Sequence, residues 1–223
     1  MASSGNFAVL NRLINSSTNT FSFGNCRITS SSGGWGAPLT LAANTGKFYV
    51  EINFVVSDAN GGRIMFLPTN SAKYNQGQQS AAGTGDYAIE WKYDGDGSYI
   101  ENNNTITQNS VGGWSQGDVA AVAFDLDASP KTITFLNNNV SLTTINITSD
   151  DTNNEFIPIW RDYTNSATLD GWFNFGQRGF IYPQTGYQGW CTHLLPDTFA
   201  GEDDEFVNNP IKYFDNTIWT GTG

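Results

Sequence analysis

Apolar and polar residues alternate along much of this chain with a period of two, which is the pattern of half-buried β-strands. The clearest case is the segment 47–56, in which four apolar residues alternate with polar or amphipathic ones. Turn-forming residues interrupt the chain about every ten residues, and helical periodicity is nearly absent. The pattern therefore predicts an all-β protein with little helix. Further strands are expected at 20–29, 63–67, 86–93, 137–150, 156–160 and 168–175.

The segment 117–135 predicts how these strands are layered. It reads as a strand, a tight turn at Ala128 to Pro130 and a returning strand. The first strand is apolar on both faces: Val119, Ala121 and Ala123 alternate with Ala120, Val122 and Phe124. A strand of this kind belongs to a sheet that is covered on both sides. We therefore expect a β-sandwich of two antiparallel sheets.

Composition and charge limit the classes of partner. The chain has 223 residues, with 10 basic and 21 acidic side chains and a net charge of −11. An acidic protein of this kind has no electrostatic footprint for nucleic acid. No stretch approaches the roughly 20 apolar residues that a membrane helix needs, so no membrane insertion is expected.

The sequence contains no recognisable catalytic set, so the chain is not expected to be an enzyme. His193 is the single histidine, and no Gly-x-Ser-x-Gly motif is present. One histidine and the distant Cys26 and Cys191 do not make a tetrahedral zinc site, and reduced cysteines are expected. Asp125 and Asp127 lie two residues apart beside a turn, where carboxylates commonly bond to the turn backbone. Glu51 is expected at a solvated strand position.

One acidic loop raises the question of a cofactor. Asp94 and Asp96 begin a segment that resembles a calcium loop, but Tyr99 stands where a Gly is needed and Thr105 replaces the closing Glu. A turn rich in Asp and Gly explains this segment better. No cofactor is therefore expected, and a weak surface Ca²⁺ site at Asp94 and Asp96 is the alternative.

Aromatic residues in the predicted loops are the candidates for ligand binding. Aromatic side chains stack on sugar rings and anchor protein contacts, with Arg and Asp supplying hydrogen bonds around them. For each residue the alternative is that it packs over an end of the sandwich. The candidates are Trp35, Tyr74, Tyr99, Trp114, Arg161, Asp162 and Tyr163.

The domain organisation is indicated by a change of residue composition near the C-terminus. Residues 1–196 are expected to form the β-sandwich, and residues 197–211 read as an acidic linker. Residues 212–223 resemble the start of a following β element or of an assembly strand. A lone β segment needs a partner strand, so a homotrimer or another homo-oligomer is expected.

Several short motifs, in this order, resemble the SPRY (B30.2-like) domain in the form found in virion structural proteins of tailed bacteriophages. The first three motifs are the opening segment (7–13), a first strand (21–26) and a characteristic strand (46–52). The other three are a mid-domain turn (93–98), a central hairpin (117–139) and a closing strand (173–180). The segments 187–196, 212–215 and 219–223 resemble the region C-terminal to this domain in phage virion proteins. Arg12, Ala120 and Leu136 depart from the residue types usual in the family.

The resemblance implies a bent antiparallel β-sandwich of the SPRY or concanavalin-like jelly-roll type, without a cofactor, that binds ligands through loops at one end. It implies a viral structural protein, such as a tail fibre, a spike or a capsid-surface component, located in the virion after assembly in the host cytoplasm. The expected partners are other virion proteins and a host-surface glycan or protein. Two alternatives remain open: an intracellular peptide-binding adaptor of SPRY type, and a glycan depolymerase.

Overall fold

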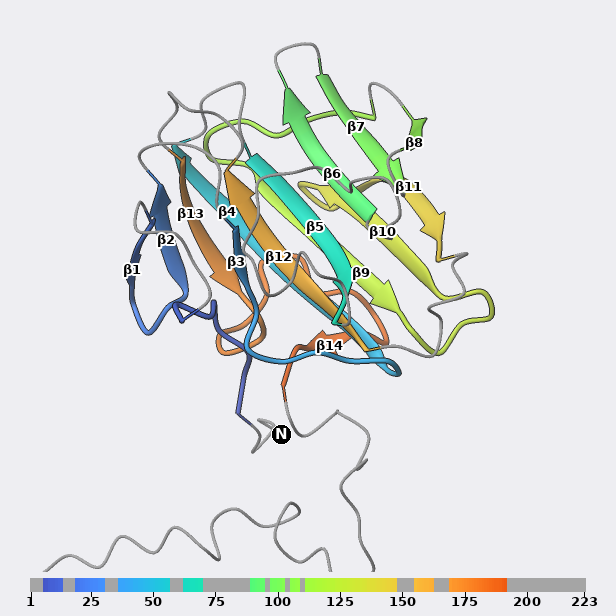
Figure 1. Ribbon diagram of the computed structural model, residues 1–223, viewed down its shortest axis with the longest axis horizontal. Helices are drawn as coiled ribbons and strands as arrows, with labels where there is room; N and C mark the ends of the chain where they lie inside the picture. The colour runs from blue at the N-terminus through green and yellow to red at the C-terminus, as the bar shows by residue number, and fades with distance from the viewer. Residues whose placement is uncertain are drawn as a thin grey trace, which may run out of the picture.

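The computed structural model describes ten stretches of the chain, which form two β-sheets (Figure 1). These stretches are residues 6–13, 19–30, 36–56, 62–69, 89–94, 97–102, 105–108, 111–147, 155–162 and 169–191. Within them the regular structure is β-strand, and none of their residues is helical. The protein is all-β, as predicted.

The larger sheet has eight strands in the order β1-β2-β13-β4-β9-β10-β11, and β14 pairs with β4. All its pairings are antiparallel except that of β14 with β4, which is parallel. Its strands are β1 (Asn19–Ser22), β2 (Arg27–Ser30), β4 (Lys47–Val56), β9 (Val119–Asp125), β10 (Thr132–Asn137), β11 (Val140–Asn146), β13 (Leu169–Asn174) and β14 (Gln188–Gly189).

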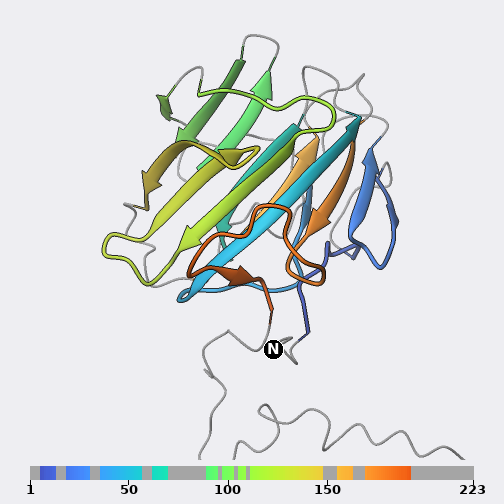
Figure 2. The same cartoon turned by 180° about the vertical axis from the view of Figure 1, so that it is seen from behind.

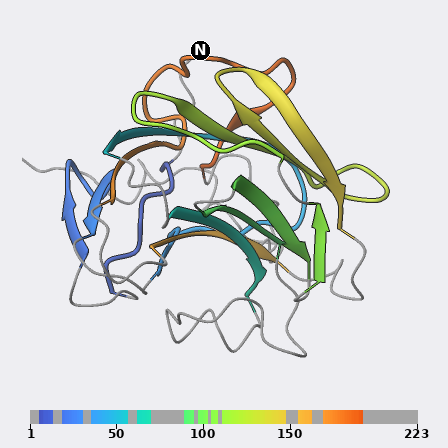
Figure 3. The same ribbon diagram turned by 90° about the horizontal axis from the view of Figure 1, so that it is seen from above.

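The smaller sheet has six strands in the order β3-β12-β5-β6-β7-β8, all antiparallel. Its strands are β3 (Gly36–Pro38), β5 (Gly62–Pro68), β6 (Ile89–Asp94), β7 (Gly97–Asn102), β8 (Thr105–Gln108) and β12 (Phe156–Asp162). The two curved sheets lie one above the other (Figure 3). The architecture is the expected antiparallel β-sandwich.

The core lies between the two sheets and is rich in aromatic side chains. The face of β9 that carries Ala120, Val122 and Phe124 belongs to this core, as the alternation predicts. Ring contacts join the sheets: Phe66 of β5 lies 4.7 Å from Phe124 between ring centroids. The large fully buried side chains include Trp91, Trp160 and Trp190.

Part of the opposite face of the larger sheet is covered by residues 176–187, here called the strap, which crosses β4 and β9 (Figure 2). Tyr49 and Ala121 are buried beneath it, and Phe180 of the strap packs against them. A close approach of backbones fixes where the strap begins. A Cβ on Gly189 would lie 2.4 Å from the Phe175 carbonyl oxygen and 2.6 Å from Gly176 Cα. Only glycine fits there.

Most strand predictions hold, and one is wrong. The prediction for residues 47–56 coincides with β4, and those for 156–160 and 168–175 fall on β12 and β13. The single strand expected at 20–29 is instead a hairpin of β1 and β2. Phe23, Gly24 and Asn25 have φ of 51°, 64° and 63°, a left-handed run that ends one strand and reverses the chain.

The chain enters and leaves the sandwich side by side. Phe7 and Cys191 form an antiparallel bridge, and the Ala8 N–H donates to the Trp190 carbonyl at 2.8 Å. The linker expected at 197–211 and the element expected at 212–223 lie outside the described residues, so both stay predictions. No helix in the described stretches has the length and apolar character to cross a membrane.

Candidate functional site

The structure gathers part of the predicted ligand-binding set at one end of the smaller sheet. Arg161 and Asp162 end β12, and Tyr99 lies in β7. Trp35, Tyr74 and Tyr163 lie outside the described residues. Trp35 directly precedes Gly36, which pairs with Arg161, and Tyr163 directly follows β12. Four of the seven candidates are therefore in or next to the end of β12 and the start of β3, which are neighbouring strands. They are Arg161, Asp162, Tyr163 and Trp35.

Strand register adds two basic positions that sequence reasoning missed. Arg161 of β12 pairs with Arg63 of β5, and Arg63 pairs with Lys92 of β6. Lys92 in turn pairs with Tyr99. We call the three cationic positions Arg161, Arg63 and Lys92 the basic row. It holds three of the ten basic residues in the chain.

The basic row lies on the outer face of the smaller sheet. The preceding row of paired positions consists of Trp160, Ile64 and Trp91, which are all buried in the core. Since successive residues of a strand alternate between faces, the next row belongs to the opposite face. The strand register therefore places three cationic residue types at directly paired positions of one row.

Acidic residues flank the Lys92 end of the basic row along β6. Lys92 lies between Glu90 and Asp94 on the same face of β6. Along β12 and β5 the corresponding neighbours two residues inward are Ile159 and Met65, which carry no charge. The paired positions Arg161 and Arg63 lie at the strand ends where the candidate loops begin.

Trp114 does not belong to this end of the molecule. It is 2% exposed and is part of the sandwich core. Its ring meets the Trp91 ring edge-on, with 4.7 Å between centroids. Of the two roles that the sequence left open for Trp114, the structure places it in the packing role.

The carboxylates beside the β9–β10 turn serve that turn. Asp125 accepts hydrogen bonds from the N–H groups of Asp127 and Ala128 at 3.2 and 3.0 Å. Asp127 accepts one from the Gly46 N–H at 2.7 Å, and Lys47 pairs with Asp125 at 2.7 Å. The structural interpretation of both residues is confirmed.

Glu51 is a correction to the sequence analysis, because it is buried rather than solvated. Its side chain lies beneath the strap, 2% exposed. The carboxylate accepts the N–H groups of Ile181 and Tyr182 at 2.8 and 2.7 Å. The neighbouring Tyr49 hydroxyl lies 3.5 Å from it, and burial, together with the Glu51 charge, raises the pKa of Tyr49 far above its usual value. Strand alternation cannot reveal this burial, since the cover comes from a segment 130 residues away.

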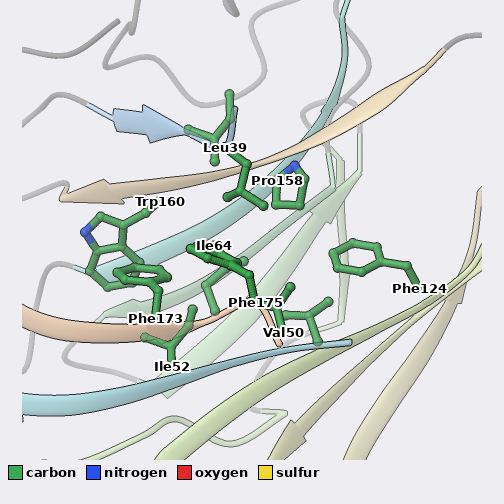
Figure 4. A pocket seen from close by; sticks show the side chains of 11 residues that line it. Leu39, Val50, Ile52, Ile64, Phe124, Pro158, Trp160, Phe173 and Phe175 are labelled. Carbon is green, nitrogen blue, oxygen red and sulfur yellow. The ribbon is translucent and has the colours of Figure 1, made fainter. Parts of the chain in front are cut away.

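Among the described residues there is no metal cluster, and the apolar cavity between the sheets is too small for a ligand. No group of three or more His, Cys, Asp or Glu side chains among them could hold a metal ion. Asp94 ends β6, while Asp96 and His193 lie outside the described part of the chain. An apolar cavity between the sheets, beside Val50, Trp160 and Phe173, measures about 10 Å³ (Figure 4). That is about the space of one water molecule, too small for a ligand.

Neither Cys26 nor Cys191 is in a disulfide bond in the structure. Cys191 is buried, and Cys26 is half-buried near Gln177 and Arg178. Burial raises the pKa of the Cys26 thiol, with a smaller opposing contribution from the hydrogen bond to Gln177 and the charge of Arg178. A thiol of this kind is a poor nucleophile at neutral pH, because only the thiolate reacts.

Comparisons with known proteins agree with this architecture. No protein-family model matches the sequence, and the search of curated proteins finds no match. Among solved structures, the chain is similar to the TRIM65 PSpry domain, with a TM-score of 0.58 and 11% identity over 76% of this chain and 92% of that one. It is also similar to the SPRY domain of human HERC1, with a TM-score of 0.57 and 15% identity over 76% and 99% of the two chains.

A third similar structure is stonustoxin, with a TM-score of 0.53 and 14% identity. It is matched over 75% of this chain but only 27% of its own. These likenesses, together with the two antiparallel sheets, confirm the predicted fold: the chain has the all-β sandwich fold of SPRY domains.

Proposed function

We propose that this chain is a non-catalytic binding module that holds a protein partner at the basic-row end of the smaller sheet. The observation that carries the proposal is the register that aligns Arg161, Arg63 and Lys92 on one outer face. Arginine is enriched at the energetic centres of protein interfaces, and its fork binds carboxylates in a bidentate way. The SPRY-type fold supports the same interpretation, because folds of this kind present loops at the ends of a rigid sandwich.

The finer proposal places the module in the virion of a tailed bacteriophage, as a tail-fibre, spike or capsid-surface component. Its support is the order of the sequence motifs between residues 7 and 180, together with the segments after residue 186 that resemble phage virion proteins. The partner is then a neighbouring virion protein or a structure on the host surface. A homo-oligomer, such as a trimer, belongs to this proposal because a lone β segment of the kind expected at 212–223 needs a partner strand.

Binding at the basic row is tested by charge reversal. The double variant Arg161→Glu/Arg63→Glu should bind purified virion proteins or host cells at least ten-fold more weakly than the parent chain. Lys47→Glu is a control, because Lys47 lies in the other sheet and pairs with Asp125. Equal binding by the double variant and the parent would refute a contact at this end. Periodate treatment of the cells removes a glycan receptor, and protease treatment removes a protein receptor.

The virion setting needs its own test. Mass spectrometry of purified particles that carry this gene should find the chain in a constant ratio to the major capsid protein. Light scattering of the purified chain should give a mass of at least twice 24.3 kDa. A chain that is absent from particles, and monomeric, would contradict the structural role.

The second candidate is a peptide-binding adaptor, which the likeness to the TRIM65 and HERC1 domains favours. An adaptor would bind a short linear peptide at a preformed surface and would have no need of assembly. Absence from purified particles, combined with capture of a short acidic peptide by the basic row, would support the adaptor over the virion component.

A further inference from the structure

A second surface lies on the larger sheet, at the turn between β1 and β2. One residue of this turn, Phe23, has a strained backbone conformation and an exposed side chain. Phe23 has a φ of 51° and is 63% exposed. The left-handed conformation is unfavourable for an L-residue with a side chain, and solvent is unfavourable for a phenyl ring. Its ring lies 4.3 Å from that of Trp172, between centroids. A bulky aromatic held in this way points to a function beyond the hairpin turn itself.

Two guanidinium groups surround the Trp172 ring. Arg27 lies 5.0 Å and Arg178 lies 5.9 Å from the ring centroid. Arg27 is neutralised by Asp170, to which its Nε donates at 2.8 Å. Within the described stretches no carboxylate pairs with Arg178. The surface made of Phe23, Trp172, Arg27 and Arg178, here called the aromatic cluster, therefore carries one unbalanced positive charge.

The backbone beneath Arg178 is held in place. The Gln177 side chain accepts the Phe175 N–H at 2.7 Å and donates to the Phe173 carbonyl at 2.9 Å. These two bonds close the turn that follows β13 and present the next residue, Arg178, beside Trp172. The aromatic cluster is thus a preformed surface with flat apolar rings and a cation at its side.

The chain that leaves the sandwich passes close to this surface. Gly176 lies against Gly189, since a Cβ on Gly176 would be 2.6 Å from Gly189 Cα. Cys191, the last described residue, is therefore near the start of the strap, and Arg178 is two residues from Gly176. Figures 1 and 2 show the β1–β2 turn, the end of β13 and the exit after β14 at the same end of the molecule.

The sequence beyond Cys191 has a complementary segment within reach. Residues 202–206 read Glu-Asp-Asp-Glu-Phe, which is four carboxylates followed by one aromatic ring. Glu202 is eleven residues beyond Cys191. Eleven residues span at most about 36 Å when fully extended, which is ample for the short path to Arg178. A tether of this length keeps the segment at an effective concentration in the millimolar range.

We propose that the acidic segment 202–206 docks on the aromatic cluster of its own molecule, with a carboxylate on Arg178 and the Phe206 ring beside Phe23 and Trp172. The contact is weak in absolute terms, because exposed ion pairs are screened by salt, and the tether makes it effective. Any external ligand of the cluster must then compete with the tail. This contact is separate from the basic row and does not depend on the function proposed for it.

The test uses the full chain and the indole N–H signal of Trp172 in nitrogen-edited NMR, assigned with Trp172→Phe. In the tail-neutral variant, Glu202→Gln, Asp203→Asn, Asp204→Asn and Glu205→Gln are combined. Its Trp172 signal should differ from that of the parent at 20 mM salt, and the difference should shrink by at least half at 300 mM. An unchanged Trp172 signal in the tail-neutral variant would overturn the proposal.

Charge exchange separates docking from a local disturbance. Arg178→Glu should release the tail, so that neutralising the tail in this background no longer moves the Trp172 signal. Exchanging residues 202–205 for lysine in the Arg178→Glu background should restore a salt-sensitive difference. Lys47→Glu changes the net charge equally at a position on β4 outside the aromatic cluster, where Lys47 pairs with Asp125, and the tail should still affect Trp172 in this control. Failure of the exchanged pair to restore the effect would count against direct pairing.

Dilution decides whether the tail acts within one molecule. Docking in the same chain predicts that the difference between the parent and the tail-neutral variant is constant from 20 to 400 µM protein. A difference that vanishes on dilution would show that the tail of a second copy occupies the cluster, and would refute the proposed contact. A synthetic peptide of residues 199–208 should move the Trp172 signal of the tail-neutral variant only at millimolar concentrations.

Discussion

The strap crosses one half of the outer face of the larger sheet, over β4 and β9 (Figure 2). The other half, over β2 and β13, uses similar side chains in the opposite way. Over β4 and β9, the strap buries Tyr49 and Glu51. Over β2 and β13, Trp172 and Phe23 stand at the surface with two arginines. Each half pairs aromatic rings with charged groups on a common sheet. The difference is that the strap covers the first half, whereas Phe23 on the second half is 63% exposed.

The cover decides what the charges do. Beneath the strap, the Glu51 carboxylate accepts two backbone N–H groups, with the Asn174 amide and the Tyr49 hydroxyl at 3.5 Å, and it is only 2% exposed. On the other half, the Arg178 guanidinium lies 5.9 Å from the Trp172 ring centroid, and no carboxylate of the described stretches forms an ion pair with it. A buried charge on this sheet therefore secures the fold, while an exposed one is available for recognition.

The largest effect on stability is expected at Gly189, where the segment after the strap packs against the residues just before it. Gly189→Ala places a methyl group 2.4 Å from the Phe175 carbonyl oxygen, so that the backbone there must shift. We expect the free energy of unfolding to fall by about 3 kcal/mol, measured by urea denaturation. Gly179→Ala is the matched control, since a Cβ there meets nothing within 4 Å. Equal stability of the two variants would mean that the strap is not fixed by this contact.

The next largest effect is the difference in the free energy of unfolding between alanine variants of two phenylalanines on this face. Phe180→Ala removes the ring that packs edge-on against Tyr49, with 4.9 Å between centroids, and should cost about 2 kcal/mol. Phe23→Ala removes an exposed ring and should cost less than about 1 kcal/mol. Both values come from chemical denaturation. A larger cost for Phe23→Ala would assign its ring to the fold rather than to binding.

Replacing the buried carboxylate tests its structural role. Glu51→Gln keeps the shape but weakens the two hydrogen bonds from the strap, because a charged acceptor binds more strongly than an amide oxygen. We expect a loss of about 2 kcal/mol in the free energy of unfolding. Glu155→Gln, at an exposed position, should change stability by less than about 0.5 kcal/mol.

The smallest effect concerns alkaline pH. The pKa of Tyr49 is raised in the folded state, so its contribution to stability is complete below pH 10, the usual value for tyrosine. It is then lost as the pH rises, because the unfolded chain ionises first. Stability should fall more steeply above pH 10 in the parent than in Tyr49→Phe. Unfolding curves at pH 9, 10 and 11 measure this difference, and parallel curves would contradict it.

Strand patterns were sufficient to predict the architecture. Alternation in β4 and the two-sided apolar strand β9 predicted the layers, because burial in a sandwich depends on neighbours at a period of two. The same reasoning failed at 20–29, where Phe21 and Phe23 suggest one continuous strand. Phe23 and Asn25 there adopt positive φ, and this cannot be predicted from the strand pattern.

The candidate sites were less predictable, because they arise from long-range pairing. Arg161 was identified from its place near aromatic loop residues, but Arg63 and Lys92 join it only through cross-strand register. Phe23 and Trp172 are 149 positions apart in sequence and meet because β2 pairs with β13. Glu51 shows the opposite failure, since a distant strap hides a residue that local alternation places in solvent.

The bridge between Phe7 and Cys191 has a mechanical consequence. Tension applied to the segments on either side of the sandwich would meet at this bridge, and the paired strands of the two sheets would be sheltered from the pull. A modest force would part the Ala8–Trp190 hydrogen bond first, while the core stays intact. A pull on both sides of the sandwich would therefore load this bridge before it loads the strand pairings of the sheets.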